Sequence, residues 1–301
     1  MSDQNKKIEA MLYLLDDNDI EVVEQIESKL LDMGSAILPI LEEQWHKENL
    51  TALHHEKIFD LLSKIKTRTI LEEILNWKNN ENNSALEGAI LISKAFYPNY
   101  DYTLIDKEIE SIRMDTWLQY QNTLSAWEKV RVLNDVFFTK YGYKGDRENY
   151  HSADNSMIHK VIENKKGNPI SLSILYFTVA QKLNLPIFGV NLPQHFVMAF
   201  MPSLFDESTG DFSKKYQLNK DDYVGDPLFY IDAFSEGLPF DKDRLNTFLK
   251  EVKVEPNDNY YEPCSNLEIV QRIARNLKFS LTQKSDTKRL LLLDEIIKLI
   301  H

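Results

Sequence analysis

Residues 165–200, KKGNPISLSILYFTVAQKLNLPIFGVNLPQHFVMAF, decide the fold of this chain. Asn168 is a favourable N-cap, and Pro169 fits the first helical position, where its missing N–H costs nothing. The following LSILYFTVA is apolar on nearly every side, which predicts a buried central helix. Two strands rich in β-branched and aromatic residues should come next, and the second begins at His195.

A third strand and a long polar segment complete this middle part of the chain. The stretch PLFYIDAF, residues 227–234, has the composition of a strand and carries Asp232. The polar residues 202–225 between the second and third strands should form a surface loop. His195 thus follows Pro169 by 26 residues, and Asp232 follows His195 by 37.

The first hundred residues contain one short amphipathic helix after another. Helical periodicity recurs in segments that include residues 20–34, 52–65 and 68–77. Short amphipathic helices cannot bury their apolar faces alone, so they stack on one another. Residues 14–41 resemble a HEAT-type repeat, and we therefore expect a HEAT-like helical array over residues 1–100.

Pro98 and the polar residues after it end this first helical pattern. We therefore expect three parts: a helical array at 1–100, an α+β core at 101–250 and a helical extension at 251–301. Strands confined to the middle of the chain, between helical flanks, predict a mostly α protein with a small α+β core.

The composition is that of a soluble globular protein, with 43% hydrophobic and 27% charged residues. The 35 basic and 47 acidic side chains give a net charge of −12, which opposes phosphate backbones and anionic membranes. We expect neither a nucleic acid nor a membrane as partner. The N-terminus lacks the apolar core of a secretory signal, and no apolar run approaches the roughly 20 residues of a membrane span. These features predict a cytoplasmic protein.

The residue pattern gives little support to metal or cofactor chemistry. The single cysteine, Cys264, excludes an internal disulfide and a cysteine-rich metal cage. Neither the dinucleotide pattern nor the Walker pattern occurs. Adjacent His54 and His55 point to different helix faces, and His151 and His159 lack a ligand spacing. We expect no metal and no cofactor, and we interpret all four histidines as polar surface or capping residues.

The order of helix start, strand histidine and strand aspartate resembles the transglutaminase-like core of the papain-like superfamily. The resemblance rests on residues 133–200 and on YIDAF at 230–234, and it covers roughly residues 104–301. Within that superfamily the chain is most similar to the SirB-type branch, found in bacterial regulator-like proteins and in some F-box proteins. Residues 266–278, NLEIVQRIARNLK, resemble the helical extension that follows the core in that branch. The resemblance implies a papain-like core with a short antiparallel sheet.

The resemblance also assigns positions to a catalytic site. In active transglutaminase-like enzymes a cysteine at the helix N-terminus is the nucleophile, a histidine activates it and an aspartate orients the histidine. By position, His195 matches the histidine, Asp232 matches the acid, and Pro169 stands where the cysteine would be. Proline there fits the SirB-type branch, many of whose members share Pro-Ile-Ser. Gln194 is a second departure, because that branch usually shows glycine before the histidine.

Two functions remain open. Pro169 removes the covalent route, which favours a pseudoenzyme that binds or regulates other proteins through its cleft or its helical array. His195 and Asp232 are retained, which leaves the alternative of a hydrolase or amide-processing enzyme that uses this dyad with water or a serine. The same two residues also fit a structural pair that holds two strands in register.

Four further residues are candidates for the lining of the cleft: Asn168, Ser171, Gln194 and Tyr176. Ser171 occupies the third helical position, where we expect hydrogen bonding at the helix end, and Ser173 should permit close packing. A serine two residues beyond the nucleophile's position is rotated by about 200° around the helix, which disfavours it as a replacement nucleophile. Cys264 precedes a helix, and nothing in the sequence places it near the cleft.

Overall fold

The structure is a computed structural model that describes residues 3–17, 19–46, 51–121, 123–202 and 225–301. It divides the chain into two compact units, Met1–Asn76 and Trp77–His301. Helix α4 (Ala52–Asn79) runs across this division. The division into three parts at residues 100 and 250 stays a prediction.

The first unit is built from amphipathic helices that share one apolar core. Its elements are α1 (Asp3–Tyr13), α2 (Ile20–Asp32), α3 (Leu38–Trp45) and most of α4. The core contains Ile8, Leu12, Leu30, Leu41, Ile58, Leu61 and Ile65. Each helix contributes one apolar stripe, because only that face is hydrophobic. The resemblance of residues 14–41 to a HEAT-type repeat stays a prediction.

The expectation of two separate helices at 52–65 and 68–77 was wrong. Helix α4 continues without a break through Lys66 and Thr67. Neither residue is glycine or proline, and nothing around them supplies a helix stop, so the backbone hydrogen-bond ladder runs on. The polar pair interrupts the apolar periodicity without interrupting the helix.

The second unit surrounds a small sheet with helices, which confirms a mostly α protein with a small α+β core. Its helices are α5 (Ala85–Phe96), α6 (Thr103–Trp117), α7 (Ala126–Asn134), α8 (Ile158–Asn164), α9 (Pro169–Lys182), α10 (Lys242–Glu251), α11 (Asn266–Gln283) and α12 (Thr287–Ile300). Its antiparallel sheet has the order β3 (Ile187–Leu192), β4 (His195–Phe200), β5 (Phe229–Asp232) and β6 (Leu238–Phe240). A short parallel pair joins β1 (Lys144–Gly145) to β2 (Lys166–Gly167).

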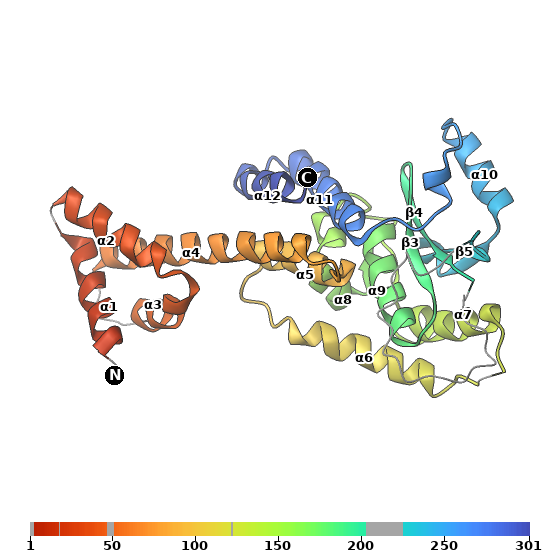
Figure 1. The fold of residues 1–301 in the computed structure, drawn as a ribbon, viewed down its shortest axis with the longest axis horizontal. Coiled ribbons are helices and arrows are strands. Elements are labelled where there is room, and N and C mark those ends of the chain that lie inside the picture. The colour runs from red at the N-terminus through yellow and green to blue at the C-terminus, as the bar shows by residue number, and fades with distance from the viewer. Residues whose placement is uncertain (1–2, 18, 47–50, 122, 203–224) are drawn as a thin grey trace. The chain divides into compact units, whose positions relative to one another are not determined.

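Helix α9 is the buried centre of the second unit (Figure 1). It begins at Pro169 with Asn168 as N-cap, as the sequence predicts. One side of the helix packs on β3 and β4, and α6 and α8 also contact it. A helix that is apolar all round needs such cover on several sides. Helix α9 is therefore held against the sheet by packing on several sides.

The register of the sheet places two polar residues at the ends of its two inner strands, β4 and β5. Strands β3 and β4 form a hairpin in which Leu192 pairs with His195. Strand β5 pairs with β4 through Met198 and Ile231, and Asp232 is its last residue. The expected third strand is thus confirmed at Phe229–Asp232. The surface loop expected between β4 and β5 lies mostly at 203–224, outside the described residues.

Two of the four histidines expected at the surface are buried, which corrects that expectation. Nε2 of His54 lies 3.1 Å from the carbonyl oxygen of Leu12. His159 is fully buried, because its short helix α8 also buries the neighbouring Ile158 and Val161. Its ring lies among those of Tyr97, Tyr100 and Tyr102, at centroid distances of 4.5, 4.7 and 5.9 Å. No described residue hydrogen-bonds either ring nitrogen of His159.

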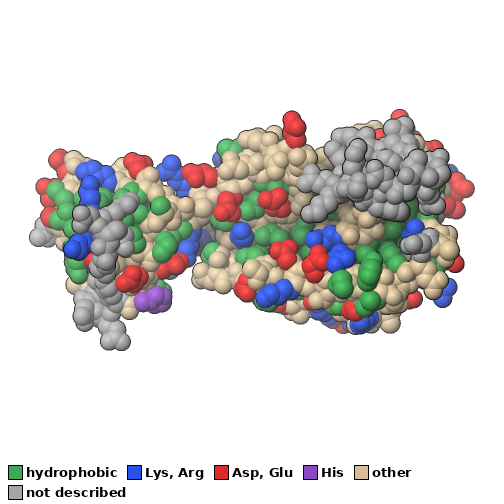
Figure 2. Space-filling view, turned by 60° about the horizontal axis from the view of Figure 1, so that its bottom comes forward, with side chains coloured by type: hydrophobic (Ala, Val, Ile, Leu, Met, Phe, Trp, Pro, Cys, Tyr) green, Lys and Arg blue, Asp and Glu red, His purple; other side chains and the backbone are tan. Residues whose placement is uncertain are grey.

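The charges of the second unit are mixed on the face that Figure 2 shows. Asp and Glu side chains lie among Lys and Arg side chains there.

No helix in the described ranges combines the length and the apolar character that crossing a bilayer requires.

Candidate functional site

The site begins with a contact between two neighbouring strands. Nε2 of His195, the first residue of β4, lies 3.2 Å from Oδ2 of Asp232, the last residue of β5. The two side chains are 21% and 17% exposed, so the pair is partly shielded and still reachable from solvent. Asp232 also accepts hydrogen bonds from the backbone N–H groups of Phe234 and Ser235 and from the Ser235 hydroxyl.

These contacts keep Asp232 ionised. Burial acts to raise the pKa of Asp232, but the hydrogen bond and charge of His195, together with the donors from Ser235 and Phe234, outweigh it and lower the pKa below its usual value. With an ionised carboxylate as partner, the proton of a neutral His195 ring belongs on Nε2. Nδ1 is then a lone-pair acceptor, and no described residue hydrogen-bonds it. This is the orientation that a general base or a ligand-binding imidazole requires.

At the N-terminus of α9, the polar side chains of Asn168, Ser171 and Ser173 form hydrogen bonds with the helix backbone. Oδ1 of Asn168 accepts from the N–H groups of Ile170 and Ser171, at 3.1 and 2.9 Å. The Ser171 hydroxyl lies 3.1 Å from the Asn168 nitrogen and 3.2 Å from the Asn168 carbonyl oxygen, which completes a capping box. Ser173 donates to the carbonyl oxygen of Pro169 at 2.7 Å. Both serine hydroxyls therefore serve the helix.

Gln194 lies in the two-residue turn between β3 and β4. Its φ is +60°, which is the left-handed region, and Pro193 precedes it. Proline followed by a residue with positive φ is the pattern of a type II turn. A glycine would adopt this backbone without steric cost, which explains in physical terms why glycine suits the position. In this chain the turn instead presents a carboxamide beside His195.

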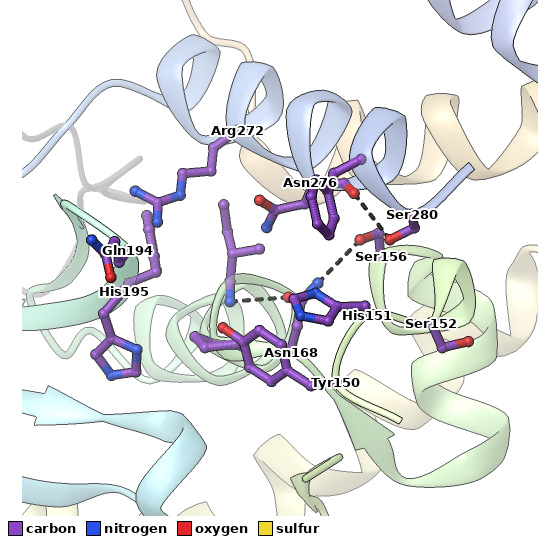
Figure 3. A pocket seen from close by; sticks show the side chains of 14 residues that line it. Tyr150, His151, Ser152, Ser156, Asn168, Gln194, His195, Arg272, Asn276 and Ser280 are labelled. Atoms are coloured by element: carbon purple, nitrogen blue, oxygen red, sulfur yellow. Dashed lines mark hydrogen bonds between the residues drawn. The ribbon is translucent and has the colours of Figure 1, made fainter. Parts of the chain in front are cut away.

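These elements enclose a pocket of about 390 Å³ (Figure 3). Its lining includes Asn168 and Pro169 from the start of α9 and Gln194 and His195 from the hairpin. The structure thus brings four of the sequence-based candidates to one pocket. Asp232 supports His195 without being part of the lining.

Ser171 and Tyr176, which we expected in the cleft, are not among the lining residues. Tyr176 is fully buried, and its hydroxyl donates to Oδ1 of Asn134 at 2.7 Å. Nδ2 of Asn134 in turn donates to the carbonyl oxygen of Gly237 at 2.8 Å. Tyr176 therefore ties α9 to the segment between β5 and β6. Its contribution to the site is to hold the scaffold in place.

Helix α11 supplies one wall of the pocket, which the sequence reasoning missed. The wall consists of Arg272, Asn276, Phe279 and Ser280. Their spacing puts them on one helix face, which is a signal that the sequence contains. Nη1 of Arg272 donates to Oδ1 of Asn191 and to the carbonyl oxygen of Leu192, so the helix is fixed to the end of β3. In Figure 3, Arg272 reaches from α11 toward the side of the pocket that carries Gln194.

The loop before α8 closes the pocket with Tyr150 and His151. The ring of His151 lies 5.1 Å from that of Phe279, and Tyr150 lies 5.6 Å from Phe234. Cys264 is not a lining residue; its N–H donates to the Gly189 carbonyl oxygen of β3 at 2.9 Å. Burial lowers the pKa of the Arg272 guanidinium, and Cys264 lies near enough to act against that shift. Within the described part of the chain, no three His, Cys, Asp or Glu side chains form a group that could hold a metal ion.

Comparisons with known proteins extend these observations. The family model of the transglutaminase-like superfamily matches residues 103–275, which is more than half of the chain and includes Pro169, His195 and Asp232. No solved structure matches this chain.

Several curated proteins are similar to the chain. A UPF0162 protein of Xylella fastidiosa strain 9a5c is 28% identical over 213 residues, covering 66% of this chain and 65% of that protein. The F-box only protein 21 of Homo sapiens is 26% identical over 242 residues, covering 73% of this chain and 36% of that protein. The chain thus spans slightly less than two thirds of the first protein and about a third of the second.

Proposed function

Because this chain belongs to the transglutaminase-like superfamily, we propose that it has kept the scaffold of an acyl-transfer site and uses it to bind or regulate other proteins without covalent chemistry. The observation that carries this proposal is the position of Pro169. It lines the same pocket as His195, at the first position of the helix where the nucleophile of the superfamily would lie.

The remaining residues of the site do not replace the nucleophile. Ser171 is 1% exposed and is engaged in the capping box, and Ser173 is fully buried and bonded to Pro169. Loss of one member of a catalytic unit costs several orders of magnitude in rate. What survives is a pocket with hydrogen-bonding groups on several sides, which suits recognition.

Two further features support a protein as the partner. The similarity to F-box only protein 21 fits a role in contacts with other proteins. The net charge of −12 disfavours phosphate backbones and anionic lipid surfaces as partners. From the sequence resemblance and the similarity to UPF0162 proteins of Xylella fastidiosa, we further propose that the protein belongs to the SirB-type branch and works in the cytoplasm of a bacterium, without a cofactor.

The proposal is tested with a purified partner protein, one substitution at the site and one control substitution outside it. A partner co-purified with the full chain is re-purified, and its dissociation constant is measured for wild type, His195→Ala and Arg275→Gln, a surface control on α11. Binding with no turnover of the partner, for wild type and for both variants, supports the proposal. Chemical conversion of the partner that stops with His195→Ala contradicts it.

One observation favours a second function. Nδ1 of His195 has no partner among the described residues while Asp232 holds Nε2, so the dyad is oriented to activate a water molecule. Hydrolysis of amides, esters or glutamine side chains would then depend on both residues. A substrate screen that compares wild type with His195→Ala, Asp232→Asn and Ser171→Ala distinguishes the routes. Activity lost only with the first two supports water, and additional loss with Ser171→Ala supports a serine.

A further inference from the structure

Arg272 is a half-buried cation without an acidic partner in the described structure. Its Nη1 donates to two neutral acceptors, Oδ1 of Asn191 and the carbonyl oxygen of Leu192. No described carboxylate lies within ion-pair distance of it, and no described residue accepts from its Nε or Nη2. Burial lowers the pKa of Arg272 from its high ordinary value, yet the guanidinium remains charged at neutral pH. A partly desolvated charge without a counter-charge is energetically unfavourable. An anion bound beside the guanidinium would therefore be stabilised.

The lining of the pocket makes Arg272 the dominant charge there. None of the lining residues is Asp or Glu, although the whole chain carries 47 of them. The carboxylate of Asp232 is engaged with His195, Ser235 and Phe234. Because the lining contains an arginine and no carboxylate, the electrostatic potential inside the pocket favours the binding of negatively charged ligands.

The guanidinium geometry narrows the class of anion. With Nη1 occupied, the N–H groups of Nε and Nη2 remain, and these lie parallel on one edge of the guanidinium plane. Two parallel donors match the two oxygens of a carboxylate. One positive charge balances a carboxylate, whereas a phosphate group carries about 1.5 to 2 negative charges. The amides of Gln194 and Asn276 line the same pocket and add donors around such a ligand.

We propose that this pocket binds a carboxylate group of a polypeptide, with Arg272 as the residue that holds it. The inference rests on the proposed binding function and names the chemistry that the site recognises. A polypeptide offers this group in two ways, at its C-terminus or on an Asp or Glu side chain. The pocket of about 390 Å³ has room for a short segment around either.

Matched peptide pools test the inference with the full-length protein. The first pair consists of N-acetylated tetrapeptides without acidic residues, with a free C-terminus or with an amidated one. The second pair consists of amidated tetrapeptides that contain one Glu or one Gln. Titration calorimetry should show at least about ten-fold tighter binding for the acid member of one pair, and which pair responds identifies the source of the carboxylate.

Two variants assign the effect to Arg272. Arg272→Gln should abolish the preference for acid over amide, whereas Arg275→Gln, which removes the same charge from an exposed position of α11, should keep it. Because Arg272 also fixes the end of β3, Arg272→Gln could disturb the fold. A second variant therefore tests the same claim without removing the arginine. Asn276→Asp keeps Arg272 and places a carboxylate one helical turn away in the pocket. This variant should lose at least about ten-fold in affinity for the acid peptides and should melt at a higher temperature.

The outcomes distinguish failure of the carboxylate assignment from failure of the pocket as a binding site. Acid and amide pools that bind equally, or affinity that survives Asn276→Asp, would overturn the carboxylate assignment while leaving a peptide-binding pocket. Failure of every pool to bind at millimolar concentration would overturn both the carboxylate assignment and this pocket as the binding site.

Discussion

Asp232 holds His195 through a contact of 3.2 Å between Oδ2 and Nε2, although 37 residues separate the two in the chain. The same carboxylate binds the backbone of Phe234 and the hydroxyl of Ser235. One acidic side chain therefore fixes both the histidine and the turn that follows β5. This double role means that loss of the carboxylate should be visible in stability as well as in any function of the site.

We predict that Asp232→Asn lowers the free energy of unfolding by about 1–3 kcal/mol near neutral pH, because it removes charged acceptor contacts. Hydrogen bonds keep the pKa of Asp232 below its usual value in the folded protein despite burial. A lowered folded pKa gives stability that is fully present above a pH of about 4 and is lost as the pH falls through the folded value. Urea unfolding of both proteins at several pH values measures this. A difference that stays constant down to a pH of about 3 would contradict it.

His159 should make the protein sensitive to mild acid. Burial, aided by Lys160, lowers the pKa of His159 to about 4, whereas an unfolded histidine has a pKa of about 6.5. The unfolded chain therefore binds the proton first, and stability falls as the pH drops from about 6.5 toward about 4. The loss at a pH of about 5 should be roughly 2 kcal/mol. Unfolding free energies measured across this range should show it.

Substitution of His159 separates this effect from the general response to acid. His159→Phe keeps an aromatic ring among the three tyrosines and should flatten the pH dependence between about 7 and 5. The matched control is His301→Gln, at an exposed position of the same unit, and it should leave the dependence unchanged. An unaltered profile in His159→Phe would rule out His159 as its source.

Gln194 should carry a conformational cost that glycine would relieve. Its φ of +60° is unfavourable for a residue with a side chain by about 1 kcal/mol. We expect Gln194→Gly to leave the melting temperature equal or higher, and Gln194→Val to lower it, because β-branched residues tolerate positive φ poorly. Scanning calorimetry on the three proteins provides the comparison. If valine were tolerated as well as glycine, the strained turn would be refuted.

The parts of the fold that local chemistry determines were predictable from the sequence. Asn168 and Pro169 identify the start of α9, because N-capping and the missing N–H act within a few residues. The strands β3 and β4 carry enough β-branched and aromatic residues to be recognised. By contrast β6, with three residues, and β1, with two, are too short for any periodicity to show.

The site was predictable only in part, because its contacts are long-range. The pairing of His195 with Asp232 followed from a resemblance of order and position, and no local pattern contains it. Arg272 lies 77 residues after His195 on an amphipathic helix, and its pattern is that of ordinary packing. Only the tertiary fold reveals that one face of this helix lines the pocket. The separation of Ser171 from the pocket likewise depends on hydrogen bonds that the sequence leaves undetermined.

The central claim is that residue 169 occupies the nucleophile's position beside a His–Asp pair that is still formed. The rate of alkylation of Pro169→Cys as a function of pH tests it most directly, with Cys264→Ser as background so that a single thiol reacts. We predict a thiol pKa well below the ordinary value of about 8.5, and a return toward that value when His195→Ala is added. An ordinary thiol pKa that does not respond to His195→Ala would contradict the claim.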